Sequence, residues 1–107
     1  MSLRRMMARA LGFPSVRAIR GAITVPTDDA AAIREAVIEL LDAVRRENAL
    51  GDHEVISAIF TATADLSAAF PAETARAAGW HRVPLLCTSE IAVPGSIPRC
   101  LRLLVHV

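Results

Sequence analysis

The sequence predicts a small α+β domain in which helices cover one face of a mixed β-sheet. Two observations lead to this prediction. Apolar segments rich in β-branched residues alternate with two segments of helical character, in the order β-α-β-α-β-β. The chain has 107 residues, of which 53% are hydrophobic, and this suits one domain with a core of Ala, Val, Leu and Ile.

The first half of the chain predicts a strand and a long helix. Residues 16–25, VRAIRGAITV, alternate in polarity and form the first strand. Residues 27–29, Thr-Asp-Asp, then offer an N-cap and an acidic first turn, and residues 48–51 end the helix. Asp42 is placed to pair with Arg45 or Arg46 on its outer face. Its apolar positions recur at helical spacing, at Ile33, Val37, Leu40, Leu41 and Val44.

The second half predicts three more strands and one short helix. Residues 55–63 form the second strand. A short helix follows, with Pro71 in its first turn and Gly79 at its C-cap. Residues 82–93 and 100–107 form the third and fourth strands, separated by a Pro-Gly-Ser turn.

Composition and charge separate an N-terminal arm from the main domain, and they argue against several classes of function. Residues 1–15 form a basic arm that we expect to be flexible, and residues 16–107 form the domain. The net charge of +1 gives little support to nucleic-acid binding, which would rest on the N-terminal arginines alone. Two cysteines are too few for a disulfide framework or a metal site, and no segment is long and apolar enough to span a membrane. We therefore expect a cytoplasmic protein without metal or cofactor.

Three charged side chains interrupt the apolar strand segments, namely Arg20, Glu90 and Arg102. Because an unpaired ion is costly to bury, these charges predict a pocket that holds an anionic, polar ligand. Cys87 and Glu90 are three residues apart, so strict alternation places them on opposite faces of a strand. For them to share a face, the strand would have to end near Thr88 or contain a bulge.

Three segments together resemble a known family, the monofunctional AroH-class chorismate mutases. These are VRAIRGAITV at 16–25, TADLSAAFPAETAR at 63–76 and GWHRVPLLCTSEIAVPGSIPRCLRLLVHV at 79–107. Each motif is weak alone, but they occur in the family's order and near its spacing. The resemblance covers nearly all of residues 16–107.

The resemblance implies a reaction and an assembly. The reaction is the rearrangement of chorismate to prephenate, toward phenylalanine and tyrosine, and it needs no nucleophile, metal or cofactor. The assembly is a homotrimer shaped as a pseudo-barrel, with each active site between neighbouring subunits. Catalysis would come from holding a compact substrate conformer and stabilising separated charge.

The resemblance also implies roles for the strand residues. Arg102 matches the arginine that donates to the ether oxygen of chorismate, and Arg20 matches one that binds a substrate carboxylate. Glu90 matches the carboxylate that accepts from the ring hydroxyl, and Cys87 matches a cysteine beside that hydroxyl. Three further residues, Leu86, Thr88 and Ser89, match a segment that lines the pocket.

A second group of matching residues would come from the adjoining subunit. Phe70 and Ala72 match wall residues, and Arg76 matches an arginine at the cleft mouth. Family members continue beyond the strand that matches 100–107, with a tyrosine that contacts substrate and a tail over the cleft. This sequence contains no tyrosine. If the protein lacks such a tail, we expect a more open cleft and weaker substrate binding.

Other interpretations stay open at this point. A non-catalytic trimer that binds a small dicarboxylate would use the same arginines, as would a trimeric enamine or imine hydrolase. Without the resemblance, Arg20 and Arg102 would be ordinary surface residues, Phe70 a core residue, and Arg76 part of a solvated helix face. Cys100 is expected to be a small buried hydrophobic residue, and Trp80 a packing residue.

Overall fold

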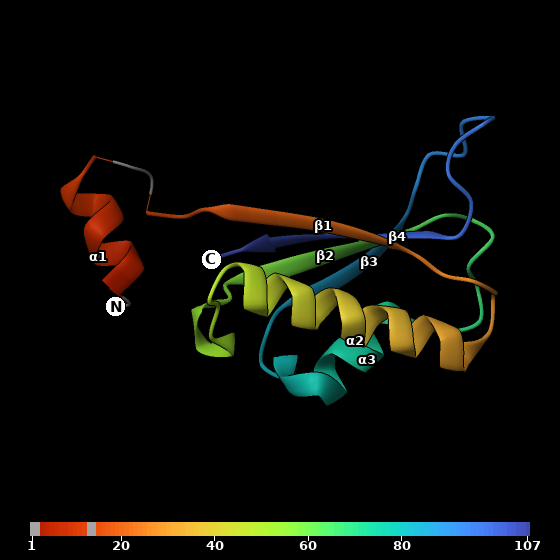
Figure 1. Cartoon of the computed structure of the whole chain (residues 1–107), viewed down its shortest axis with the longest axis horizontal. Helices are drawn as coiled ribbons and strands as arrows, with labels where there is room; N and C mark the ends of the chain where they lie inside the picture. The colour runs from red at the N-terminus through yellow and green to blue at the C-terminus, as the bar shows by residue number, and fades with distance from the viewer. Residues whose placement is uncertain (1–2, 13–14) are drawn as a thin grey trace.

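A computed structural model of the chain describes residues 3–12 and 15–107. Figure 1 shows a sheet with helices along one side, and a short helix set apart from this body. In chain order the elements are α1 (Leu3–Ala10), β1 (Ala18–Thr24), α2 (Ala30–Glu47), η1 (Asp52–Glu54), β2 (Ser57–Ala62), α3 (Pro71–Ala75), η2 (Arg76–Trp80), β3 (Leu85–Ser89) and β4 (Cys100–His106). The predicted order of strands and helices from residue 16 onward is confirmed. The helix α1 lies in the segment expected to be a flexible arm, and that flexibility stays a prediction.

The sheet is mixed, as predicted, and its strand order is β1-β4-β2-β3. The last strand, β4, lies between the first two and runs antiparallel to both, whereas β2 and β3 are parallel. A parallel pair requires a crossover connection, which α3 and η2 provide here. The strands β1 and β3 are therefore the two edges of the sheet.

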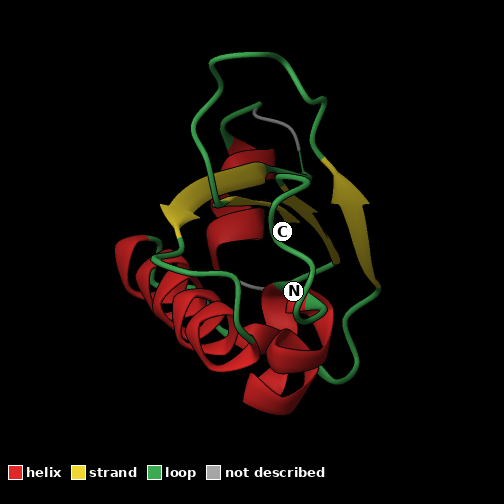
Figure 2. Cartoon of the chain, turned by 90° about the vertical axis from the view of Figure 1, so that its right-hand side faces the viewer, coloured by secondary structure: helices red, strands yellow, loops and turns green. Residues whose placement is uncertain are grey.

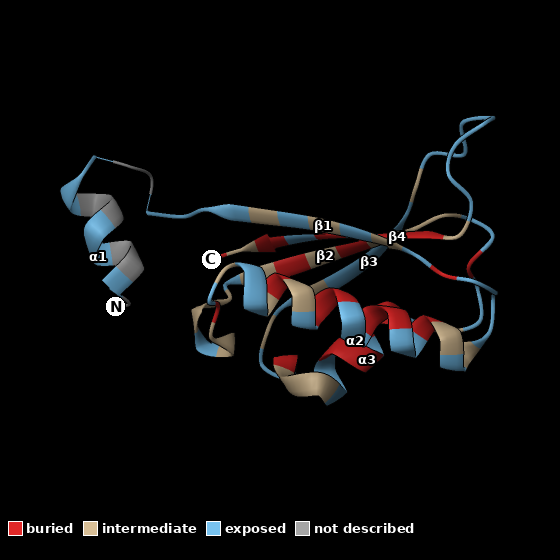
Figure 3. Ribbon diagram, in the orientation of Figure 1, coloured by how far each residue is buried: buried red, intermediate tan, exposed pale blue. Residues whose placement is uncertain are grey.

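Only one face of the sheet is covered by helices. Figure 2 shows α2 and α3 on the same side of the strands, and Figure 3 shows that buried residues lie where helices and strands meet. Gly21 of β1 allows this close packing, since a Cβ there would lie 3.0 Å from Leu40 Cδ1. The core includes the large side chains Ile33, Leu41, Phe60, Trp80, Leu101 and Leu103.

The predicted N-cap of α2 is confirmed, but the predicted acidic first turn is wrong, because both aspartates precede the helix. The Asp29 carboxylate caps the helix by accepting a hydrogen bond from the backbone N–H of Ala32 at 2.7 Å. Asp28 has a different role, because it accepts from the backbone N–H groups of Ser67 and Ala68, which precede α3. The two aspartates therefore start α2 and tie its beginning to the segment before α3.

Each observed strand is shorter than its predicted range, and the third strand and the short helix differ most from the prediction. The third strand covers only Leu85–Ser89 rather than 82–93, because its partner β2 ends at Ala62, opposite Ser89. The short helix becomes a π-helical turn after Ala75, in which Gly79 has a φ of 123°. Glycine accepts this left-handed conformation without strain, so it ends the regular helix as its predicted C-cap role implied.

Candidate functional site

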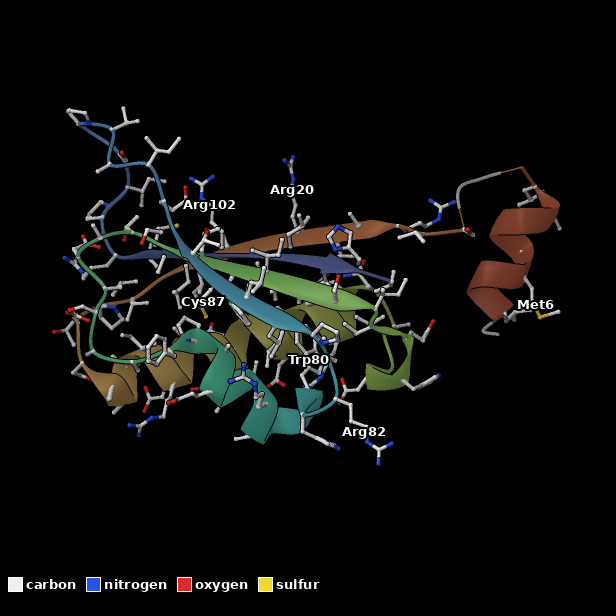
Figure 4. The ribbon with its side chains drawn as sticks, turned by 180° about the vertical axis from the view of Figure 1, so that it is seen from behind. Met6, Arg20, Trp80, Arg82, Cys87 and Arg102 are labelled. Atoms are coloured by element: carbon white, nitrogen blue, oxygen red, sulfur yellow. The ribbon has the colours of Figure 1, made fainter. Side chains whose placement is uncertain are left out.

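The two strand arginines lie together on the face of the sheet that no helix covers. Arg102 of β4 pairs in register with Ala22 of β1, and Arg20 lies two residues before Ala22. Residues in this diagonal relation share a face and lie within reach of long side chains. Figure 4 shows both guanidinium groups pointing away from the helices.

Glu90 joins the arginines on this face through two contacts. Its Oε1 atom accepts a hydrogen bond from Thr61 Oγ1 at 2.5 Å and forms an ion pair with Arg102 Nε at 3.3 Å. Its backbone N–H donates to Ala62 O, which holds the residue beside the end of β2. The structure therefore unites the three charges that the sequence singled out, and adds Thr61.

Within the described residues, one chain does not enclose the side chains of Arg102 and Glu90. The Arg102 side chain is 58% exposed and the Glu90 side chain 26% exposed. These charges cost little free energy of desolvation because they stay partly in water. Any enclosed site on this face requires a second molecule over it.

Cys87 lies on the opposite side of β3 from Glu90. It borders a cavity of 920 Å³ between the sheet and the helices, which Phe70, Thr88 and Ser89 also line. Figure 4 shows Cys87 on the helix side of the sheet. Strict alternation along the strand is thus kept, and neither an early strand end at Thr88 nor a bulge brings Cys87 and Glu90 to one face.

The remaining candidates are also divided between the two sides. Leu86 is exposed on the same face as Arg20. The two are linked by strand pairing, since Leu86 pairs with Ile59, Ile59 with Leu104, and Leu104 with Arg20. Ala72 is buried in α3, whereas Arg76 is exposed at the start of η2. Phe70 is exposed despite its size. In one chain, the charged residues Arg20, Glu90 and Arg102 therefore lie on the opposite side of the sheet from Phe70.

Two aspartates in the loops at one end of the sheet have lowered pKa values. Hydrogen bonds from the backbone N–H groups of Ser67 and Ala68 lower the pKa of Asp28. A hydrogen bond from the Thr63 hydroxyl, and then one from the backbone of Arg99, lower the pKa of Asp65. Such donors favour the charged form. Asp65 thereby anchors the loop that leads from Glu90 to the strand of Arg102.

Sequence reasoning missed two groups of polar residues. Thr61 was read only as part of a strand, because its contact with Glu90 depends on the register of β2 against its neighbours. Asp52 was given no role, yet its carboxylate accepts from Arg45 and from Trp80 Nε1. Trp80 is buried and Cys100 is buried, as expected.

Within residues 3–12 and 15–107, no three His, Cys, Asp or Glu side chains are grouped so that they could hold a metal ion. The same residues contain no helix of the length and apolarity that crossing a membrane requires.

Comparison with known proteins identifies a family for the chain. The family described as chorismate mutase type I matches residues 16–107. The chain belongs to this family. The match takes in both sides of the sheet, including the strand arginines, Glu90 and the Phe70 segment.

Individual members of the chorismate mutase family are close to the chain. It is 53% identical to chorismate mutase AroH of Thermus thermophilus over 90 residues, covering 83% of this chain and 74% of that protein. It is 37% identical to chorismate mutase AroH of Bacillus subtilis over 93 residues, covering 86% and 73% respectively. A solved chorismate mutase from Clostridium thermocellum has a TM-score of 0.82 at 46% identity, covering 85% of this chain and 81% of that one.

Proposed function

We propose that this member of the chorismate mutase family converts chorismate to prephenate on the uncovered face of its sheet. The observation that carries the proposal is the grouping of Arg20, Arg102 and Glu90 there, in a chain that matches the family over residues 16–107. The reaction is an intramolecular rearrangement in which a C–O bond breaks as a C–C bond forms. It calls for positioning and for charges that suit a polarised transition state.

Each charged group has a part suited to its chemistry. Arg102 donates to the ether oxygen, where negative charge grows as the C–O bond breaks. Arg20 binds a substrate carboxylate, for which the planar guanidinium fork is well shaped. Glu90 accepts the ring hydroxyl and lies near the ring carbons that become electron-poor. Leu86 and Thr88 of β3 share this face and complete the β3 side of the site, whereas Cys87 and Ser89 alternate to the helix side of the strand.

The site is completed in a homotrimer by a neighbouring subunit. Phe70 and Ala72 of that subunit form a wall against the substrate, and Arg76 lies at the cleft mouth. Support comes from the exposed apolar side chains that one chain leaves in water, among them Phe70, Leu86 and Leu104. Light scattering of the purified protein tests the trimer, and a monomeric mass at assay concentration contradicts it.

The direct test of function is to add purified protein to chorismate and follow its ultraviolet absorbance. We expect chorismate to disappear and prephenate to form, faster than in the absence of protein. Binding without turnover would instead support a non-catalytic dicarboxylate-binding protein, for which the comparisons give no support. The same proposal places the enzyme in the cytoplasm, and fractionation of the source cells tests that location.

A further inference from the structure

Thr61 lies at the centre of the charged group and is held rigidly there. In β2 it pairs with Arg102 of β4 on one side and with Thr88 of β3 on the other. Its backbone is therefore fixed by strands on both sides. Its β-branched side chain has few rotamers available, so its hydroxyl has a well-defined place on the uncovered face.

The Thr61 hydroxyl makes the shorter of the two contacts to Glu90. The Thr61 Oγ1 to Glu90 Oε1 distance is 2.5 Å, against 3.3 Å from Arg102 Nε to the same oxygen. An ionised carboxylate only accepts hydrogen bonds, so the hydroxyl donates its proton to Glu90. A bond of this charge-assisted kind is stronger than one between neutral groups.

Both contacts end on one carboxylate oxygen. Among residues 3–12 and 15–107, no hydrogen bond is made to the other oxygen, Oε2. Glu90 follows the last paired residue of β3, and its flexible side chain has no strand neighbour beyond it to fix its direction. Thr61 therefore supplies the fixed point that determines where Oε2 is presented.

We propose that Thr61 is a positioning residue that fixes Glu90 Oε1 so that Oε2 faces the substrate hydroxyl. Arg102 contacts the same oxygen, most closely through Nε. The inference rests on the proposed function, since it names the residue that orients one of its charged groups. A purely structural hydrogen bond would have no such consequence for turnover.

The first experiment replaces Thr61 by valine, which keeps the β-branched shape and removes the hydroxyl. We expect kcat for chorismate to fall by about tenfold to a hundredfold with a smaller change in KM, because a displaced reacting group costs mainly transition-state stabilisation. Thr61→Ser restores the hydroxyl and should return kcat to within about threefold of the parent. Thr24→Val is the matched control, because Thr24 is exposed at the end of β1.

The second experiment asks whether Thr61 acts through Glu90. In a Glu90→Ala background, Thr61→Val should change kcat/KM by less than about twofold, since the group it orients is gone. An equal loss in both backgrounds overturns the inference, as does a fully active Thr61→Val protein. Thermal unfolding of each variant separates these results from loss of the fold.

A crystal structure of Thr61→Val gives a readout that does not depend on turnover. We expect the Glu90 side chain to leave its place beside Arg102, or to occupy several positions, while it stays ordered in the unchanged protein. An unmoved Glu90 contradicts the inference. If the unchanged protein shows no chorismate turnover, the proposed function fails, and the position of Glu90 still decides whether Thr61 orients it.

Discussion

Two arginine–carboxylate pairs lie in different parts of the fold and differ in how fully their polar groups are used. Arg45 of α2 meets Asp52 through two bonds, Nε to Oδ1 at 2.9 Å and Nη2 to Oδ2 at 3.1 Å. The same arginine donates to Ala78 O, and its Nη1 lies 3.6 Å from Asp42. Trp80 Nε1 donates to the Asp52 carboxylate as well. Every nitrogen of this guanidinium has a partner.

The pair on the uncovered face is built in the opposite way. The closest contact between Arg102 and Glu90 is longer, at 3.3 Å, and 58% of the Arg102 side chain is exposed, compared with 23% for Arg45. The Arg45–Asp52 pair, in which every guanidinium nitrogen has a partner, is called the saturated pair below, and it holds the fold together. The Arg102–Glu90 pair stays accessible to a ligand.

The saturated pair also explains the turn before β3. Arg45 and Asp52 hold Ala78 and Trp80, which flank Gly79 with its φ of 123°. A Cβ on Gly79 would lie 2.7 Å from Asp52 Oδ2. The turn, and therefore the path of the chain into β3, depends on this packing.

We expect the greatest loss of activity when Arg102 is removed. Arg102→Ala should lower kcat/KM about 100-fold to 1000-fold, the usual cost of losing one donor to a developing oxyanion. Most of the loss should be in kcat, because the contact strengthens in the transition state. A chorismate assay checks this, with circular dichroism to confirm the fold. Arg45→Met, in contrast, should lower stability and change kcat/KM by less than about threefold.

Gly79→Ala tests the packing around the saturated pair. It should lower the free energy of unfolding by about 2–3 kcal/mol, through backbone strain together with the clash against Asp52. Gly95→Ala is the control, because Gly95 has a φ of 84° and no atom within 4 Å of the added Cβ. That change should cost only about 1 kcal/mol. Equal losses of the free energy of unfolding for the two variants in chemical denaturation would show that packing against Asp52 adds no further cost at Gly79.

Asp52→Asn tests the ion pair itself. The side chain is 41% exposed, so we expect a loss of only about 1 kcal/mol in the free energy of unfolding. Asp42→Asn removes the weaker partner of the same arginine and should cost less than about 0.5 kcal/mol. Urea denaturation of both variants gives the comparison. A larger loss at Asp42 would reverse our ranking of the two partners.

The smallest expected effect concerns acid stability. The pKa of Asp28 is lowered from its ordinary value of 3.8 by backbone donors, and that of Asp65 is lowered by Thr63 and Arg99. A carboxyl with a lowered folded pKa stabilises the fold above its unfolded value, and this contribution is lost as pH falls through the folded value. The melting temperature should therefore drop below about pH 4. The melting temperature of the Asp28→Ala variant should fall less steeply over this range than that of the parent.

The sequence by itself determined the order of the elements and the identity of the charged residues. Asp29 caps α2 and Gly79 ends the helix after α3, because such signals act within a few residues of chain. Arg20, Glu90 and Arg102 were recognisable because charge is rare in apolar strand segments.

Which of these residues come into contact depends on how the strands pair. The position of β4 between β1 and β2 brings Arg102 beside Thr61, and the register of β2 and β3 places Glu90 next to both. The contact between Asp52 and Trp80 likewise joins residues from separate elements. Long-range pairing depends on which whole faces bury together, and a slip of one residue turns every side chain to the other face. Local sequence patterns therefore do not predict the strand order or the register.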